Sequence, residues 1–221
     1  MEKRKLLIGT YDTALTGLWT LSSWELGRAE LKEEYADVPG HSGPLDLSTA
    51  LTDGEPLYGS RPFKATLESS EGSRLEREAR INQMINWLDG WRLNIVLPDD
   101  PTHYVTGRIK VTKLYNDMAH ASVQVDASCD PWKYNASETV VGLIATTTEQ
   151  TASLINNGRL AVTPTITVTD GSVNLSFGEN SWALGGGVYV LPAIYLKTGT
   201  HPLRYSGTGT VLLTYREAVL S

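Results

Sequence analysis

Residues 106–114 read TGRIKVTKL, and the apolar side chains among them fall on every second position. This alternation predicts a β-strand with one buried face. Residues 122–127, SVQVDA, repeat the pattern, and residues 115–120 between the two runs have turn chemistry. Upstream, residues 35–47 have the pattern of a strand, a Pro/Gly turn and a second strand. We therefore predict a long antiparallel hairpin within a mainly β fold.

The long hairpin leads into residues 129–134, CDPWKY, which hold the only cysteine of the chain. Pro131 cannot donate a hydrogen bond to a β-ladder, so it should end the strand that carries Cys129. We expect Cys129 to be buried, and Trp132 and Tyr134 to anchor the crossing into a second domain.

The composition changes after this segment. Residues 137–221 contain many Thr, Val and Gly and few charges. Short strand-like runs occupy residues 159–162, 165–168 and 172–177. Asp170–Gly171 has the composition of a hairpin turn between the last two runs. Strands and turns at this spacing predict a small β-sandwich, and hence two domains, residues 1–135 and 136–221.

One segment has helical periodicity instead. Ser73 and Glu76 have the spacing of a capping box, in which each side chain satisfies a backbone donor at the helix start. The apolar residues that follow at roughly helical spacing are Leu75, Ala79, Ile81, Met84, Ile85 and Leu88. Gly90 can adopt the left-handed conformation that ends a helix. We predict one amphipathic helix, about residues 74–89, packed on a sheet.

The composition also limits the classes of function. The chain has 221 residues, of which 41% are apolar and 20% charged, as in a folded protein. A net charge of -6 argues against a protein that grips nucleic acid by neutralising phosphates. No apolar run is long enough to span a bilayer, and the start MEKRKLLIGTY lacks the features of a signal peptide. We expect synthesis in the cytoplasm without export.

The reactive residue types form no recognisable catalytic pattern. Cys129 could be the nucleophile of a cysteine hydrolase, but an unpaired cysteine at a strand end is more often a small buried side chain. Asp99–Asp100 lies between two prolines and is predicted to connect strands rather than to act as an acid–base pair. Gly185–Gly187 is followed by no Lys-Ser or Lys-Thr, so we interpret it as a turn and not as a phosphate loop.

The histidines offer no metal site. They are widely separated, form no HxH or HExxH pair, and are expected in exposed loops: His41, His103, His120 and His201. We predict no catalytic, cofactor-binding or metal-binding residue, no cofactor and no enzymatic activity.

The aromatic composition suggests a binding function as an alternative. The chain contains six Trp and ten Tyr but only two Phe. Trp and Tyr side chains have an apolar body and a polar tip, and such side chains are favoured at interfaces and sugar-binding faces. A carbohydrate-binding module that recognises host cell-wall saccharide would need several of them on one exposed face. Otherwise Trp87 and Trp91 pack on the sheet at the helix end, and Trp19 and Trp24 belong to an N-terminal strand.

Over nearly its whole length the chain resembles the distal tail protein (Dit) family of long-tailed, siphovirus-type bacteriophages and prophages. The resemblance rests on the order of a β unit with one helix, a hairpin running into CDPWKY, and a short β-sandwich. Local matches occur at residues 37–47, 58–62, 81–88, 92–97, 104–108, 157–158, 164–166 and 215–217, and at Leu196, Gly199, Gly207 and Gly209. His201 departs from the family pattern, which has an asparagine at that place.

The resemblance implies two β-sandwich-like domains, the second a small galectin-like or carbohydrate-binding-module-like sandwich. It implies a ring, usually a hexamer, that joins the tail tube to the baseplate and host-adsorption apparatus at the virion tail tip, after assembly in the cytoplasm of the bacterial host. The implied partners are the tail tube protein, the tape measure protein, and tail-associated and receptor-binding proteins, with no membrane.

DNA would pass through the central channel of that ring without specific binding. The acidic balance of the chain agrees with this role, because a wall that repels phosphates lets DNA slide. A closed ring also requires each subunit to present two different complementary surfaces.

Overall fold

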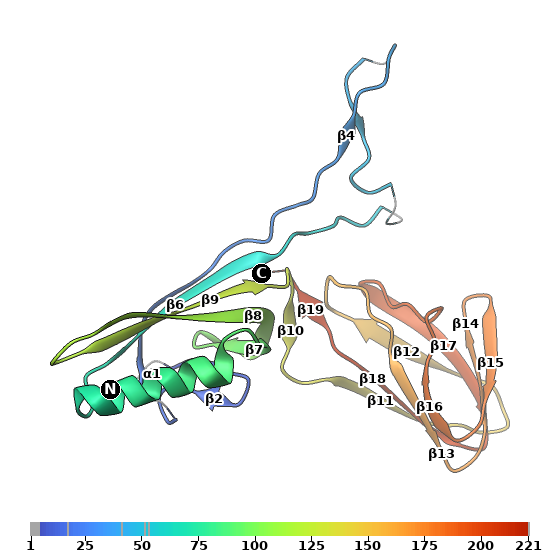
Figure 1. The fold of residues 1–221 in the computed structure, drawn as a ribbon. Coiled ribbons are helices and arrows are strands. Elements are labelled where there is room, and N and C mark those ends of the chain that lie inside the picture. The colour runs from blue at the N-terminus through green and yellow to red at the C-terminus, as the bar shows by residue number, and fades with distance from the viewer. Residues whose placement is uncertain (1–4, 17, 41, 51, 53, 221) are drawn as a thin grey trace. The chain divides into compact units, whose positions relative to one another are not determined.

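Figure 1 shows the computed structural model of the chain, which describes residues 5–16, 18–40, 42–50, 52 and 54–220. These residues form mainly β structure with one helix, as predicted. The chain divides into two compact units, unit 1 up to Lys133 and unit 2 from Tyr134 to Leu220, whereas the sequence suggested a boundary after residue 135.

Unit 1 is built on an antiparallel sheet with the strand order β2-β1-β7-β8-β9-β6-β3. Its strands are β1 (Leu7–Ile8), β2 (Tyr11–Asp12), β3 (Thr20–Leu26), β6 (Arg61–Ser69), β7 (Arg92–Leu97), β8 (Asp100–Asn116) and β9 (Ala121–Cys129). The predicted long hairpin is the β8–β9 pair at the centre of this sheet, and β9 ends two residues before Pro131.

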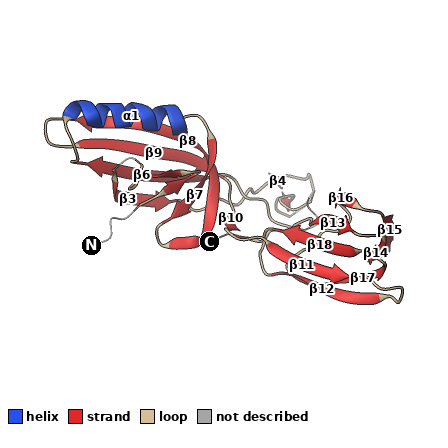
Figure 2. Cartoon of the chain, turned by 90° about the horizontal axis from the view of Figure 1, so that it is seen from below, coloured by secondary structure: helices blue, strands red, loops and turns tan. Residues whose placement is uncertain are grey.

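The helix α1 (Arg74–Leu88) packs over β8 and β9 on one face of the sheet (Figure 2). Both hydrogen bonds of the predicted capping box join Ser73 and Glu76, and Gly90, just beyond the helix, has a φ of 79°. The helix buries Arg77, Ile81, Met84 and Leu88. The prediction that Leu75 belongs to the buried face is wrong: its side chain is 83% exposed, because it lies on the opposite side of the helix from this stripe.

Between β3 and β6 the chain runs out and back as a two-stranded ribbon, residues 27–60, which we call the arm (Figure 1). Here β4 (Tyr35–Ala36) pairs with β5 (Leu45–Asp46) in the antiparallel arrangement predicted from the sequence. Closer to the sheet, Leu31 and Tyr58 form a bridge. The pairing holds the two halves of the arm together without giving it a core of its own.

Unit 2 is a β-sandwich of two four-stranded antiparallel sheets, as predicted, with the strand orders β11-β18-β13-β16 and β12-β17-β14-β15. Its strands are β11 (Thr139–Ile144), β12 (Gln150–Asn156), β13 (Thr165–Thr169), β14 (Val173–Phe177), β15 (Asn180–Leu184), β16 (Gly187–Val190), β17 (Gly199–Gly207) and β18 (Thr210–Tyr215). The short strands β10 (Lys133–Asn135) and β19 (Ala218–Val219) pair with each other and belong to neither sheet of the sandwich. The core between the sheets includes Leu154, Ile166, Leu175, Leu203, Val211 and Leu213.

The predicted hairpin at Asp170–Gly171 is wrong. The strands that it joins, β13 and β14, lie in different sheets, so the chain crosses the sandwich at this point. A Cβ atom on Gly171 would lie 2.8 Å from the Thr208 hydroxyl oxygen, in the turn between β17 and β18. The glycine therefore serves a tight corner between two layers rather than a turn within one.

Residues 159–162, predicted to be a strand, form none. Val162 makes a single bridge with Leu196, and the amides of Arg159 and Leu160 both donate to the carbonyl of Ala218. The apolar run packs at the edge of the sandwich without entering a ladder.

Candidate functional surfaces

Cys129 is a buried structural thiol, as predicted for a residue at the end of a strand. Its side chain is 1% exposed, and it pairs across the strands with Gly107, where a Cβ atom would lie 2.6 Å from the sulfur. Burial, together with the neighbouring Asp130 carboxylate, raises the pKa of the thiol to about 12. Because the thiolate is the nucleophile, a thiol with this pKa gives a cysteine hydrolase no support.

Asp100 opens β8 after the turn formed by Pro98 and Asp99, so the acidic pair connects strands as predicted. One carboxylate oxygen of Asp100 lies 2.8 Å from Nδ1 of His103, and the other accepts a hydrogen bond of 3.2 Å from the Lys133 ammonium. Desolvation opposes ionisation of Asp100, but these hydrogen bonds outweigh it and lower the pKa of the carboxyl. The cluster ties the end of unit 1 to the β7–β8 turn.

The expectation that all four histidines lie in exposed loops is wrong for two of them. His103 is half-buried in β8, and His201 is half-buried in β17, with its ring 6.1 Å from that of Phe177. Both strands extend further into the turn-rich segments than the sequence indicated. His120 is exposed at the β8–β9 turn, and His41 lies outside the described residues.

Nothing in the described part of the chain resembles a metal site, since no three His, Cys, Asp or Glu side chains come together there. Within the same residues, no helix is both long and apolar enough to cross a membrane. Gly185 and Gly186 link β15 to β16, whose first residue is Gly187, and the Tyr189 hydroxyl donates to the Gly185 carbonyl at 3.2 Å.

The CDPWKY segment is fixed to the base of the arm. The rings of Trp132 and Tyr58 meet edge to face at 5.6 Å. The buried guanidinium of Arg61 donates to the carbonyls of Gly27, at 2.8 Å, and Pro131, at 3.3 Å. These contacts join three segments of unit 1 that are distant in sequence, and they hold Trp132 against the base of the arm.

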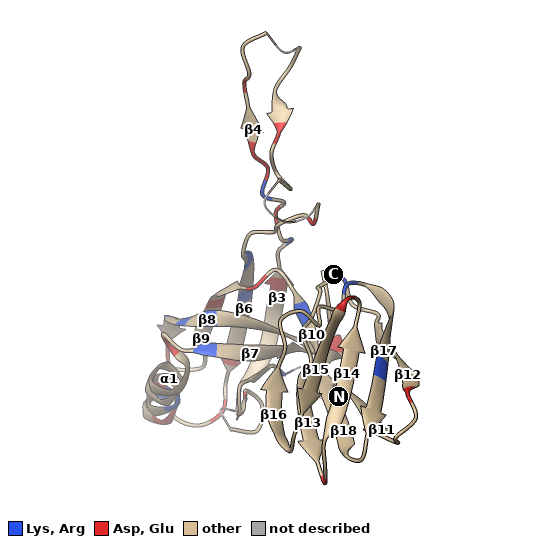
Figure 3. Ribbon diagram, turned by 90° about the vertical axis from the view of Figure 1, so that its right-hand side faces the viewer, with Lys and Arg blue, Asp and Glu red and all other residues tan. Residues whose placement is uncertain are grey.

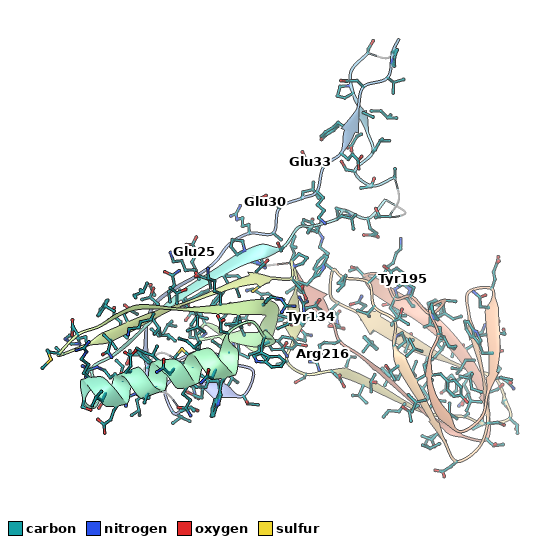
Figure 4. The ribbon with its side chains drawn as sticks, in the orientation of Figure 1. Glu25, Glu30, Glu33, Tyr134, Tyr195 and Arg216 are labelled. Carbon is teal, nitrogen blue, oxygen red and sulfur yellow. The ribbon has the colours of Figure 1, made fainter. Side chains whose placement is uncertain are left out.

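On the unit 2 side, Arg216 holds the first residues of the sandwich. Its guanidinium donates to the carbonyls of Asn135 and Ala136 and to the Glu138 carboxylate at 3.1 Å. Figure 4 labels Arg216 and Tyr134 at this entrance to unit 2.

Two exposed indoles stand at the C-terminal end of α1. Trp87 is 53% exposed and Trp91 is 63% exposed, so neither indole is buried, although Trp87 still contacts the sheet as predicted. Trp87 meets Tyr11 edge to face at 5.8 Å and lines a pocket of about 320 Å³ together with Ile8 and Leu93. Exposed tryptophans beside a pocket are typical of protein interfaces.

On the face of the unit 1 sheet opposite α1, two central rows hold polar or charged side chains, and Figure 3 shows that acidic and basic positions both occur on the strands of this sheet. One row across β3, β6, β9 and β8 alternates in charge: Glu25, Lys64, Asp126 and Lys110. The neighbouring row is uncharged and polar: Ser23, Thr66, Gln124 and Thr112. Two acidic and two basic side chains give these rows no net charge, so they do not form the acidic wall that the sequence suggested.

Most of the net negative charge of the chain comes from the arm. Residues 27–60 contain seven acidic and two basic side chains, a net -5 of the total -6. Figure 4 labels Glu30 and Glu33 among them. Five apolar side chains of the arm are between 44% and 55% exposed: Leu31, Tyr35, Val38, Leu45 and Leu57. A segment that is both acidic and apolar is suited to docking on another surface.

Unit 2 does not gather aromatic side chains on one exposed face. Among the described residues of unit 2, Tyr195 is the only aromatic residue whose side chain is largely exposed, and its exposed fraction is 48%. Trp182, Tyr189 and Tyr205 are partly buried against the sandwich core. The aromatic platform required by the carbohydrate-binding alternative is therefore not present in this arrangement.

Comparison with solved structures connects this architecture to a known protein. The crystal structure of the SPP1 Dit (gp 19.1) protein, described as a paradigm of the hub adsorption apparatus in phages that infect Gram-positive bacteria, matches with a TM-score of 0.67. The match covers 97% of this chain and 99% of that chain at 16% sequence identity. The chain has the fold of SPP1 Dit.

The phage p2 baseplate in its activated conformation with Sr also matches, over 97% of this chain and 98% of that chain, but with a TM-score of 0.39 and 8% identity we draw nothing from it. No family model and no curated protein sequence matches the chain. The Dit-like fold expected from the sequence is thus confirmed by structure at an identity where sequence comparison finds nothing.

Sequence reasoning missed two features of these surfaces. The concentration of acidic residues in the arm could have been found by counting charges along the sequence. Residues 32–37, KEEYAD, already show it beside the arm's first strand. The exposure of Trp87 and Trp91 carries no comparable signal, since it depends on which side of the helix end faces the sheet.

Proposed function

We propose that this protein is a structural component of a phage tail tip, a distal tail protein whose ring joins the tail tube to the baseplate and host-adsorption apparatus. The observation that carries this proposal is the match to SPP1 Dit over nearly the full length of both chains, with a TM-score of 0.67. The ring would be a hexamer with a central channel for DNA. Its partners would be the tail tube, tape measure, tail-associated and receptor-binding proteins, and no catalytic activity is required of it.

A closed ring needs two different surfaces on each subunit, and unit 1 offers a suitable pair. The arm presents acidic and apolar side chains, with Tyr35 and Leu45 at its paired strands. The end of α1 presents the indoles of Trp87 and Trp91 beside a pocket. Apolar anchors and a pocket on distinct parts of one subunit are what heterologous association requires.

The hydrophilic face of the unit 1 sheet supports the channel. Its two central rows offer DNA neither a net positive charge for phosphates nor an aromatic platform for bases. DNA would therefore slide past such a wall because nothing there holds it. In this proposal the sheet face lets DNA pass because its charges balance. The net negative charge of the whole chain had suggested instead that the wall repels the phosphates.

Native mass spectrometry and negative-stain electron microscopy of the purified chain test the ring. We expect sixfold rings for the natural sequence and their loss in the arm variant Tyr35→Ser/Leu45→Ser. The matched control is Leu75→Ser, which removes an exposed apolar side chain from α1 outside the arm.

Particles provide the second measurement. Antibody labelling should place the protein at the end of the tail tube that carries the baseplate. A chain that stays monomeric at all concentrations, in particles with no ring at the tube end, would contradict the proposed function.

A further inference from the structure

One dipeptide of unit 2 has a chemistry that the proposed function does not use. Asn157 and Gly158 follow the end of β12, and Asn157 is the only asparagine of the chain that precedes a glycine. In such a pair the backbone nitrogen of the glycine can attack the side-chain carbon of the asparagine, because glycine has no Cβ atom to obstruct the approach. Asparagine is accordingly among the chemically labile residues of proteins.

The reaction needs no cofactor. The nitrogen of Gly158 forms a bond to Cγ of Asn157, and its proton leaves with the side-chain nitrogen as ammonia, so that a succinimide ring remains. A water molecule then opens the ring at either of its carbonyl groups, and the product is an aspartate or an isoaspartate. Water is the only co-reactant, and nothing is oxidised or reduced.

The attacking nitrogen is buried and hydrogen-bonded in the folded chain. The Asn157 side chain is exposed, so water can reach it, but the Gly158 amide donates a hydrogen bond of 2.9 Å to the side-chain oxygen of Asn156. Asn156 is itself 0% exposed, and its amide group donates to the carbonyls of Leu160 and Leu196 at 2.9 Å each. A buried, bonded N–H loses its proton reluctantly, because the charged form would be desolvated. The Gly158 nitrogen is therefore a poor nucleophile here.

The same dipeptide is held by residues 217–219, which we call the closing segment. The Glu217 carboxylate accepts hydrogen bonds from the backbone and side-chain nitrogens of Asn157, at 3.2 and 3.4 Å. A Cβ atom on Gly158 would lie 2.6 Å from the oxygen and 2.7 Å from the nitrogen of the Ala218 backbone. No larger residue fits at this position, so packing against the closing segment requires a glycine there despite its chemistry.

We propose that Asn157 is a site of spontaneous deamidation and that the closing segment controls it. The docked segment prevents the reaction, and the product prevents the segment from docking again. An aspartate product would place a second carboxylate where the Asn157 amide now lies, 3.4 Å from Glu217. Like charges at this distance repel, so one of them must take up a proton or move away. An isoaspartate product would add a carbon to the backbone beside Gly158, where Ala218 leaves no room for it.

Peptide mass spectrometry of the full chain during incubation at alkaline pH measures the reaction. A synthetic peptide of residues 152–162 in the same buffer gives the rate without protection. We expect Asn157 to deamidate roughly 100-fold more slowly in the folded chain, because several hydrogen bonds must open first. A folded rate within about threefold of the peptide rate overturns the protection. A folded rate above it would mean that Glu217 promotes the attack, which also overturns the proposal.

A substitution in the closing segment tests its control of the reaction. Glu217→Ala removes both acceptors from Asn157 and should raise the rate in the folded chain about tenfold. The matched control is Glu179→Ala, which removes an exposed carboxylate elsewhere in unit 2 and should leave the rate unchanged. Equal rates in both variants overturn the role of the closing segment. Circular dichroism during heating verifies that both variants are folded.

The variant Asn157→Asp carries the product from the start, so it tests the second half of the proposal. The amide of Arg159 donates to the Ala218 carbonyl at 2.8 Å, and its hydrogen exchange, followed by NMR, therefore reports docking of the closing segment. Exchange should be at least about tenfold faster in Asn157→Asp. Asn174→Asp adds the same charge at an exposed position of β14 and should leave the exchange unchanged.

An Arg159 amide that exchanges equally in the natural chain and in Asn157→Asp overturns the effect of the product on docking. None of these measurements requires a ring, since every contact involved lies within unit 2 of a single chain. A monomeric chain that gives the expected rates would therefore contradict only the proposed function.

Discussion

Arg77 offers the sharpest test of how unit 1 is held together. Its side chain is 1% exposed on the buried stripe of α1. The guanidinium donates to the carbonyl of Gly72 at 2.6 Å, to the side-chain oxygen of Asn116 at 3.3 Å, and to the carbonyls of Asp117 and Met118 at 2.9 and 3.1 Å. One buried cation thus ties the helix start to the β8–β9 turn.

Replacing Arg77 by alanine removes all four hydrogen bonds and the packing of the aliphatic stem. A hydrogen bond to a charged group contributes about 1.5–3 kcal/mol to stability. We take about 3 kcal/mol, because the acceptors in the exposed turn can bond to water in the variant. For a unit of this size that loss corresponds to a fall in melting temperature of roughly 10 °C.

Urea denaturation monitored by tryptophan fluorescence measures this loss, since five of the six tryptophans precede residue 134. Arg77→Lys should lie between the natural sequence and Arg77→Ala, because it keeps a charge but not the forked geometry. The control Arg74→Ala, on an exposed position of the same helix, should change the free energy of unfolding by about 0.5 kcal/mol at most. A loss below about 1 kcal/mol for Arg77→Ala would refute the structural role of the network.

Three further predictions concern unit 1. Ser73→Ala breaks the capping box of α1 and should lower the free energy of unfolding by about 1 kcal/mol in the same denaturation assay, and an unchanged value would argue against the cap. Gly107→Ala would place a Cβ atom 2.6 Å from the Cys129 sulfur, and the overpacking should cost about 1–3 kcal/mol, while a thiol reagent at pH 8 should label natural Cys129 only after unfolding. Hydrogen bonds from the His120 and Ala119 amides lower the pKa of Asp117, so its stabilising effect is present above the unfolded-state pKa and is lost as the pH falls through the folded-state value. Asp117→Asn should therefore flatten the acid side of the stability profile, and identical slopes between pH 5 and pH 2 for both proteins would contradict this.

The sequence was most informative where local chemistry determines structure. The capping residues Ser73 and Glu76 located the start of α1, and Pro131 located the end of β9, because each acts through its own backbone geometry. The alternation in residues 106–127 gave the central hairpin for the same reason.

Predictions that depended on distant partners were less successful. Asp170–Gly171 has the composition of a hairpin turn, but Thr208 and its neighbours in another turn direct the chain into the second sheet. Hydropathy predicts that Leu75 is buried and Arg77 exposed, but the structure shows the reverse. Arg77 can be buried because the β8–β9 turn supplies carbonyl acceptors for its guanidinium. The candidate surfaces were least predictable, because exposure of Trp87 or Trp91 depends on the complete fold.

The unequal distribution of charge between the arm and the remaining chain has a consequence for solubility. Without residues 27–60 the protein would carry a net charge of only -1, close to the condition in which proteins associate and precipitate. The charge of the arm would therefore help to keep separate copies of the chain in solution. If the arm docks on a neighbour, assembly covers the groups that keep unassembled copies apart, so the same segment would delay aggregation before assembly and allow close packing after it.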